Sequence, residues 1–210
     1  MLSGLRDLVK SKKSILALTY ISNVYVTNFG NICARNLNNS ARGFKSLNFC
    51  HSRMSFSPSQ QRRIILEKNL LDKYFPGRVS WHTPSSGEAY VEIAMVSNSN
   101  RHYKLRVYIS DDFPNSCPEM VLVSPSSLNM KDGSSMPTIS HSFHTIGTKD
   151  GYLLLCHFIP SKWTNENTLY QVFMKGRLWI EAYEGHLATG NHMDVFLKGQ
   201  SEPSGHCVVM

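Results

Sequence analysis

Residues 89–109 read AYVEIAMVSNSNRHYKLRVYI and hold two strand-like runs around a turn. Both runs, 89–96 and 103–109, are rich in β-branched and aromatic residues, and the Ser-Asn-Ser-Asn between them is typical of a turn. In the second run, apolar residues at 105, 107 and 109 alternate with Lys104, Arg106 and Tyr108. One face of this strand is therefore expected to meet a core and the other to meet water. The stretch predicts an antiparallel meander.

Helical patterns flank these strands. Ser57, with Gln60 three residues later, predicts a helix start, and Pro76-Gly77 predicts its end. The expected apolar stripe of this helix is Ile64, Ile65, Leu66, Leu70, Leu71 and Tyr74. A second helix is predicted from Thr168, with Gln171 in the capping box, to Gly190. Gly176 in its interior costs about 1 kcal/mol against Ala and indicates a close packing contact or a bend.

Between the helices, a third strand is predicted at 120–123, and 124–149 reads as a long irregular stretch followed by an apolar run at 152–159. The order of helix, antiparallel strands, long loop and helix predicts an α+β domain with helices segregated from one sheet.

The chain has 210 residues, of which 41% are hydrophobic and 18% charged, which excludes low complexity and global disorder. No apolar run reaches the roughly 20 residues of a membrane-spanning helix. The five cysteines are odd in number and scattered, which favours a reducing compartment over a disulfide framework. We expect a basic leader at 1–53, one globular domain at 54–196 and a flexible tail at 197–210.

The net charge of +7 belongs to the leader. Residues 1–53 hold eight Lys and Arg against one acidic residue, whereas residues 54–210 hold 14 of each sign. Nucleic-acid binding by the predicted domain is therefore disfavoured.

The leader itself is open to several interpretations. Leu2, Leu5 and Leu8 share a helical stripe with basic residues beside it, as in a mitochondrial presequence. A secretory signal, a disordered leader and an extension upstream of a start at Met54 are the alternatives.

Three motifs have a matching spacing in a known family. They are Phe113-Pro114 with Cys117-Pro118, His144 seven residues before Gly151, and Trp163 five residues before Thr168-Leu169. With the helix–strands–helix order, they resemble the ubiquitin-conjugating enzyme family over roughly residues 57–190, and residues 179–190 look closest to its divergent bacterial-type branch. The resemblance implies an N-terminal helix, an antiparallel four-stranded meander, a long active-site loop and a C-terminal helix.

The sequence also departs from this family. The family's His-Pro-Asn is replaced by His144-Thr145-Ile146, or by His141-Ser142-Phe143 on another alignment, so its oxyanion-binding asparagine is missing. In strict register Leu154 takes the place of the catalytic cysteine, and Cys156 stands two residues later. Cys156 nevertheless precedes Trp163 within a residue of the family's spacing.

The resemblance implies that Cys156 forms a thioester with the carboxyl terminus of ubiquitin or a ubiquitin-like protein. His144 and His157 would lower the pKa of the thiol or donate hydrogen bonds, and Asn165 would replace the missing asparagine. An activating enzyme and a ligase are the further implied partners, and no cofactor or metal is expected. From spacing alone, Cys156 reads more often as a small buried hydrophobe.

A zinc site is a weaker alternative interpretation. His141, His144, Cys156 and His157 are ligand types that zinc prefers, but the spacing of a fourth ligand is poor, and loop histidines are more often solvated.

The last four residues, Cys207-Val208-Val209-Met210, form a C-a-a-X box that predicts prenylation of Cys207, with Met favouring a farnesyl group. The alternative is a frayed terminus with an idle thiol. Because prenylation takes place in the cytosol, the box predicts a cytoplasmic protein held peripherally at a membrane, with mitochondrial import as the competing expectation from the leader.

Three functions therefore follow from the sequence. The first is a divergent ubiquitin-conjugating-type transferase tethered by a prenyl group. The second is an adaptor of the same fold and tether that binds its partners without thioester chemistry. The third is an unrelated α+β domain carried on a lipid, which a failure of residues 113–118 to form the turn between two adjacent strands would favour.

Overall fold

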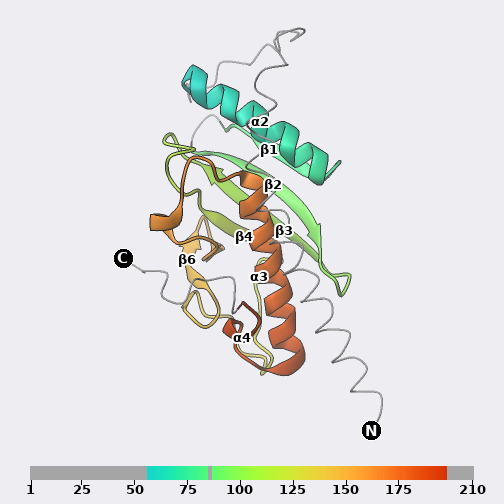
Figure 1. Cartoon of the computed structure of the whole chain (residues 1–210). Coiled ribbons are helices and arrows are strands. Elements are labelled where there is room, and N and C mark those ends of the chain that lie inside the picture. Colours follow the sequence, from blue (N-terminus) through green and yellow to red (C-terminus); the bar gives the residue numbers. More distant parts are fainter. Residues whose placement is uncertain (1–55, 85–86, 198–210) are drawn as a thin grey trace. The chain divides into compact units, whose positions relative to one another are not determined.

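Seven strands form one antiparallel sheet in the order β1-β2-β3-β4-β7-β6-β5 in the computed structural model, which describes residues 56–84 and 87–197 (Figure 1). The strands are Val79–His82 (β1), Ala89–Val96 (β2), His102–Ile109 (β3), Met120–Ser124 (β4), Ile139–Ser140 (β5), Thr145–Lys149 (β6) and Tyr152–Leu155 (β7). The helices are Pro58–Tyr74 (α2), Leu169–Thr189 (α3) and the short Asp194–Leu197 (α4), with a 3-10 turn at Pro160–Lys162 (η1). The chain is thus an α+β fold, with its long described helices before and after the sheet.

The predicted strands are confirmed, but the predicted sheet is too small. Strands β1 to β4 pair consecutively as a four-stranded meander whose first strand, β1, no residue pattern predicted, and β7, β6 and β5 then extend it. The stretch 124–149, expected to be irregular, contains β5 and β6, and the apolar run at 152–159 is a strand only as far as Leu155. The β6–β7 hairpin turns on Asp150-Gly151, both at positive φ (53° and 79°). Asp-Gly is a strong signal for a two-residue hairpin, and it explains why polar β6 is a strand.

The alternation in β3 separates the two faces of the sheet as predicted, with one exception. Leu105, Val107 and Ile109 are fully buried on the core face, while Lys104 is exposed. Tyr108, expected to meet water, is only 4% exposed. Its hydroxyl donates to Asp150 at 2.6 Å, and the ammonium group of Lys149 lies 4.2 Å from its ring, so the β6–β7 turn covers it.

Helix α2 begins as predicted, with Ser57 as N-cap and a complete capping box with Gln60. Its predicted apolar stripe is wider than the face that packs. Ile64 and Leu71 are buried, whereas Ile65 and Leu66 are 42% and 51% exposed.

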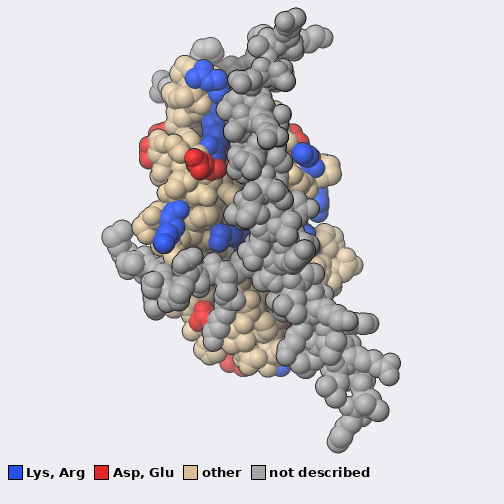
Figure 2. Space-filling view, viewed as in Figure 1, with Lys and Arg blue, Asp and Glu red and all other residues tan. Residues whose placement is uncertain are grey.

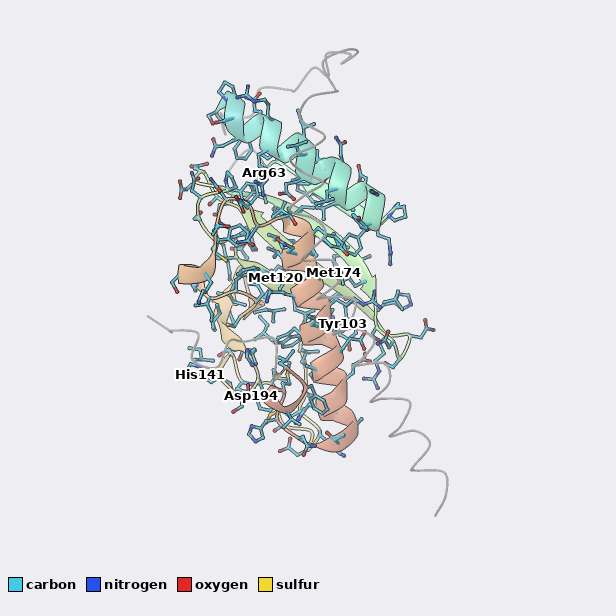
Figure 3. All side chains as sticks on the ribbon, in the orientation of Figure 1. Arg63, Tyr103, Met120, His141, Met174 and Asp194 are labelled. Atoms are coloured by element: carbon cyan, nitrogen blue, oxygen red, sulfur yellow. The ribbon has the colours of Figure 1, made fainter. Side chains whose placement is uncertain are left out.

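Helix α3 also has the predicted ends, a Thr168–Gln171 capping box and Gly190 in the left-handed conformation. It crosses the sheet over β3 and β4 (Figure 3 labels Met120 of β4 and Met174 of α3). A Cβ on Gly176 would lie 2.5 Å from Leu105 Cδ1 and 2.7 Å from Met120 Sδ. Of the two sequence-based interpretations of Gly176, close packing is therefore confirmed.

A buried carboxylate joins α2 to the start of α3. Glu67 is 1% exposed and accepts from Arg63 Nε at 2.7 Å and from the backbone N–H of Leu169 at 2.9 Å. The guanidinium of Arg63 also donates to the carbonyl oxygens of Asn165 and Asn167, just before α3. Glu67 thereby satisfies one of the orphan N–H groups at the α3 N-terminus. Burial raises the pKa of Glu67, while Arg63 and Leu169 oppose that rise.

Charges of both signs are interspersed on the described surface. Figure 2 shows Lys and Arg side chains beside Asp and Glu on the face in view. This agrees with the balanced charge count of residues 54–210.

Gly176→Ala is expected to destabilise the fold by about 1–3 kcal/mol, because the new methyl group overpacks the α3–sheet contact and outweighs the gain in helix propensity. Gly185→Ala is the matched control within α3, since the three atoms nearest to its added Cβ all belong to the Phe196 ring and lie 3.0 Å or more away. It should cost less. Urea unfolding measures both, and a Gly176→Ala protein as stable as wild type would contradict the assigned contact.

Glu67→Ala is expected to cost about 3 kcal/mol in unfolding free energy, since it removes one partner of a buried ion pair and the acceptor of the Leu169 N–H. Glu67→Gln should cost less, because an amide oxygen still accepts from Leu169.

The raised pKa of Glu67 means that the folded state binds the carboxyl proton of Glu67 more tightly than the unfolded chain does. The stability contributed by Glu67 is thus greatest at acid pH and declines as pH rises through its folded pKa. The unfolding free energy of wild type, measured relative to that of Glu67→Gln, should therefore decrease as the pH rises from 4 to 8.

Candidate functional site

Cys156 lies directly after β7 and is half-buried. Its backbone N–H donates to the carbonyl oxygen of His144 at 2.9 Å. The next pair of the same ladder, Thr145 and Leu155, is buried in the core. The structure therefore makes the predicted nucleophile and one predicted imidazole residue neighbours across the β6–β7 ladder.

The sulfur of Cys156 is disulfide-bonded in the structure, and Cys117 is the free cysteine of the described ranges. A thioester requires a thiolate, so acyl transfer at Cys156 needs the reduced form. The expectation of a reducing compartment does not account for this bond.

His144 sits at a sharp backbone turn and reaches α4. It has a positive φ of 52°, which is uncommon for a residue with a side chain and is often found at functional sites. Its Nε2 lies 2.8 Å from Oδ1 of Asp194, the first residue of α4. Sequence reasoning missed Asp194, because it lies 50 residues beyond His144 and no motif spacing links the two.

His157 faces Cys117. Its Nδ1 lies 3.3 Å from the carbonyl oxygen of Leu155, and its Nε2 lies 4.0 Å from Sγ of Cys117. Burial lowers the pKa of His157 to about 4 and raises the pKa of Cys117 to about 12, the latter with a contribution from Glu119. At neutral pH both groups are uncharged, so the contact joins a thiol and a neutral imidazole. His157 therefore offers no positive charge that would stabilise a thiolate.

Asn165, the predicted substitute for the missing asparagine, is exposed in the loop before α3. Its carbonyl oxygen accepts from Arg63 of α2. The observed contact thus places Asn165 at the α2–α3 junction, and its predicted role toward an oxyanion stays a prediction.

Two of the motifs behind the family resemblance meet in space. Residues 113–118 form the turn between β3 and β4, as expected, with a cis peptide bond at Phe113-Pro114. The indole N–H of Trp163 donates to the carbonyl oxygen of Pro114 at 2.8 Å. Gln60 of the α2 capping box donates to the carbonyl oxygen of Phe113 at 3.0 Å. The start of α2 and the residue after η1 therefore both contact this turn.

The zinc interpretation gains no support. Within residues 56–84 and 87–197, no group of three or more His, Cys, Asp or Glu side chains is gathered as metal ligands would be. His157 is directed at Cys117 and His144 at Asp194.

The membrane predictions concern other parts of the chain. Cys207 and the basic leader lie outside the described residues. Among the described residues, no helix combines the length and the hydrophobicity of a membrane-spanning segment.

Acidification is expected to destabilise the protein through His157. Because its folded pKa of about 4 is below the ordinary 6.5, the unfolded chain binds this proton more readily. Stability from this group is present above pH 6.5 and is lost as pH falls toward 4, by up to about 3 kcal/mol. Urea unfolding at pH 7 and pH 4.5 should show a loss that His157→Gln reduces. An equal loss in that variant would contradict the assignment.

The chain matches no known protein-family model, no curated protein and no solved structure. The likeness to ubiquitin-conjugating enzymes therefore rests on the quoted motifs and on the order of the elements.

Proposed function

We propose that the protein is a divergent ubiquitin-conjugating-type transferase that accepts an acyl group on Cys156. The observation that carries this proposal is the backbone hydrogen bond between Cys156 and His144, whose imidazole is itself paired with Asp194. Nucleophilic catalysis by a thiol uses an oriented base near the cysteine, and here the residue that carries the oriented imidazole is the backbone neighbour of Cys156. The turn at residues 113–118 and its contact with Trp163 support the family resemblance independently.

The proposed first step is a thioester exchange. The Cys156 thiolate attacks the carbonyl carbon of a ubiquitin-like protein's carboxyl terminus, which is held as a thioester on an activating enzyme. The new C–S bond forms on Cys156, and the activating enzyme's cysteine leaves as a thiolate. In a second step the acyl group passes to an amine, alone or with a ligase. The substrate class is thus an acceptor amine plus a ubiquitin-like protein, and no cofactor takes part.

We further propose that the protein works at a cytosolic membrane face through a prenyl group on Cys207. The C-a-a-X box is the support for this proposal. One isoprenoid anchors weakly, so the attachment would be reversible or shared with a prenyl-binding partner.

The second candidate is the adaptor, a binding module with the same fold and tether. Three observations favour it: Leu154 stands in the family's cysteine register, His157 is neutral and faces Cys117, and Cys156 is disulfide-bonded. An adaptor would bind a ubiquitin-like protein or a ligase without becoming acylated.

A charging assay distinguishes the two candidates. The full chain is reduced with a phosphine, which leaves thioesters intact, and is incubated with ATP, activating enzymes and a panel of ubiquitin-like proteins. We expect an adduct that a thiol reductant removes, present in wild type and in the matched control Cys117→Ser, and absent as a thioester in Cys156→Ser. Gels with and without thiol measure it.

The opposite result would support the adaptor. If the panel charges an authentic conjugating enzyme but not this chain, while one modifier still binds the chain in the same samples, the transferase proposal fails.

A further inference from the structure

The imidazole of His144 has one ring nitrogen committed and one available. Its Nε2 lies 2.8 Å from Asp194 Oδ1, and in residues 56–84 and 87–197 no hydrogen bond to its Nδ1 is found. A carboxylate can only accept a hydrogen bond, so in the neutral imidazole Nε2 carries the proton and Nδ1 the lone pair. Nδ1 is therefore the nitrogen that can act as a base, and the residue that carries it is bonded through its backbone to Cys156.

Packing holds Asp194 in place. Met193, just before α4, is fully buried, and its N–H donates to the carbonyl oxygen of Ser142 at 3.1 Å. The Phe196 ring packs against Gly185 of α3, where an added Cβ would lie only 3.0 Å away. Figure 3 shows Asp194 and His141 at the same end of the described fold. The turn that carries His144 and the helix that carries Asp194 are thus joined independently of their side-chain bond.

We propose that Asp194 is a positioning residue that holds His144 as the base for acyl transfer from Cys156 to an amine. This inference rests on the proposed function and extends it to the second step. The amine nitrogen attacks the thioester carbonyl carbon, the C–N bond forms and the C–S bond to Cys156 breaks. His144 Nδ1 accepts the proton that the nitrogen loses and then gives it to the departing sulfur. Asp194 fixes the tautomer and stabilises the imidazolium between these two transfers.

Three other histidines lie near the turn that carries His144. Their contacts differ from those of His144 and do not orient them as a base for Cys156. His192 stacks on Phe143 at 5.7 Å, and His186 meets the same ring edge-on at 4.9 Å. Both nitrogens of His186 are committed, Nδ1 to the carbonyl oxygen of Asn191 at 2.7 Å and Nε2 to the backbone N–H of Lys131 at 3.2 Å. His141 lies within the turn itself. Asp194 is the carboxylate bonded to His144.

Single-turnover discharge tests the inference. Reduced full-length protein is charged, and release of the modifier to free lysine is followed from pH 6 to pH 9. We expect Asp194→Asn to charge normally but to discharge at least about tenfold more slowly at pH 7, and His144→Gln about a hundredfold more slowly. Asp194→Glu keeps a carboxylate that can accept from His144 Nε2, so it should restore most of the discharge rate that Asp194→Asn loses. A merely structural role of Asp194 would not give this rescue.

The matched control is Asp72→Asn, which makes the same charge change at an exposed position of α2. Its discharge should equal that of wild type. Equal rates and equal profiles in Asp194→Asn and Asp72→Asn would overturn the inference.

A second measurement keeps the inference testable if wild type does not charge, an outcome that would count against the proposed function alone. Reduced protein is alkylated with iodoacetamide across the same pH range, and peptide mass spectrometry reads Cys156 separately from Cys117. If Asp194 holds His144 at Cys156, Asp194→Asn and His144→Gln both slow Cys156 alkylation severalfold near pH 7 and leave Cys117 alkylation unchanged. An unchanged Cys156 profile in both variants would overturn the inference.

Discussion

The close approach of α3 to the sheet at Gly176 is the constraint on which the other contacts depend. Leu105 and Met120 fill the space that any larger residue at 176 would need, so the helix axis is fixed against β3 and β4. From this contact, α3 positions two segments along its C-terminal half. Trp179 donates to the carbonyl oxygen of Phe143 at 2.9 Å, and Gly185 receives the Phe196 ring of α4. The turn of His144 and the helix of Asp194 are therefore both set by one helix, although they belong to distant parts of the sequence.

Local signals predicted the parts of the fold that local forces determine. Capping boxes at Ser57 and Thr168, the alternation in β3 and the stop at Gly190 depend on neighbouring residues, and each prediction is confirmed except at Tyr108 of β3. The missed elements obtain their conformation from partners far away or from a short turn. β1 has four residues that pair with β2, and α4 has four residues that depend on buried Met193. Too few residues lie in either element for a periodic pattern to show.

The candidate site also has a part that sequence spacing predicted and a part that only the structure shows. Motif spacing brought Cys156 and His144 into one prediction, and the β6–β7 ladder makes them neighbours. Spacing also suggested His157 beside Cys156, but adjacent residues at the end of a strand point in different directions, and the His157 ring meets Cys117. The Asp194 contact spans 50 residues and depends on how α4 packs, so it required the structure.

The bond between Glu67 and the amide of Leu169 encloses most of the described domain. It spans 102 residues, and all seven strands lie between its two ends. Closing so long a loop has a large entropic cost, which is recovered only when the intervening sheet is already packed. We therefore expect this amide, which belongs to the first residue of α3, to find its partner late in folding. In the native state, hydrogen exchange at the Leu169 amide consequently reports separation of the first and last long helices, and not fraying of α3 alone.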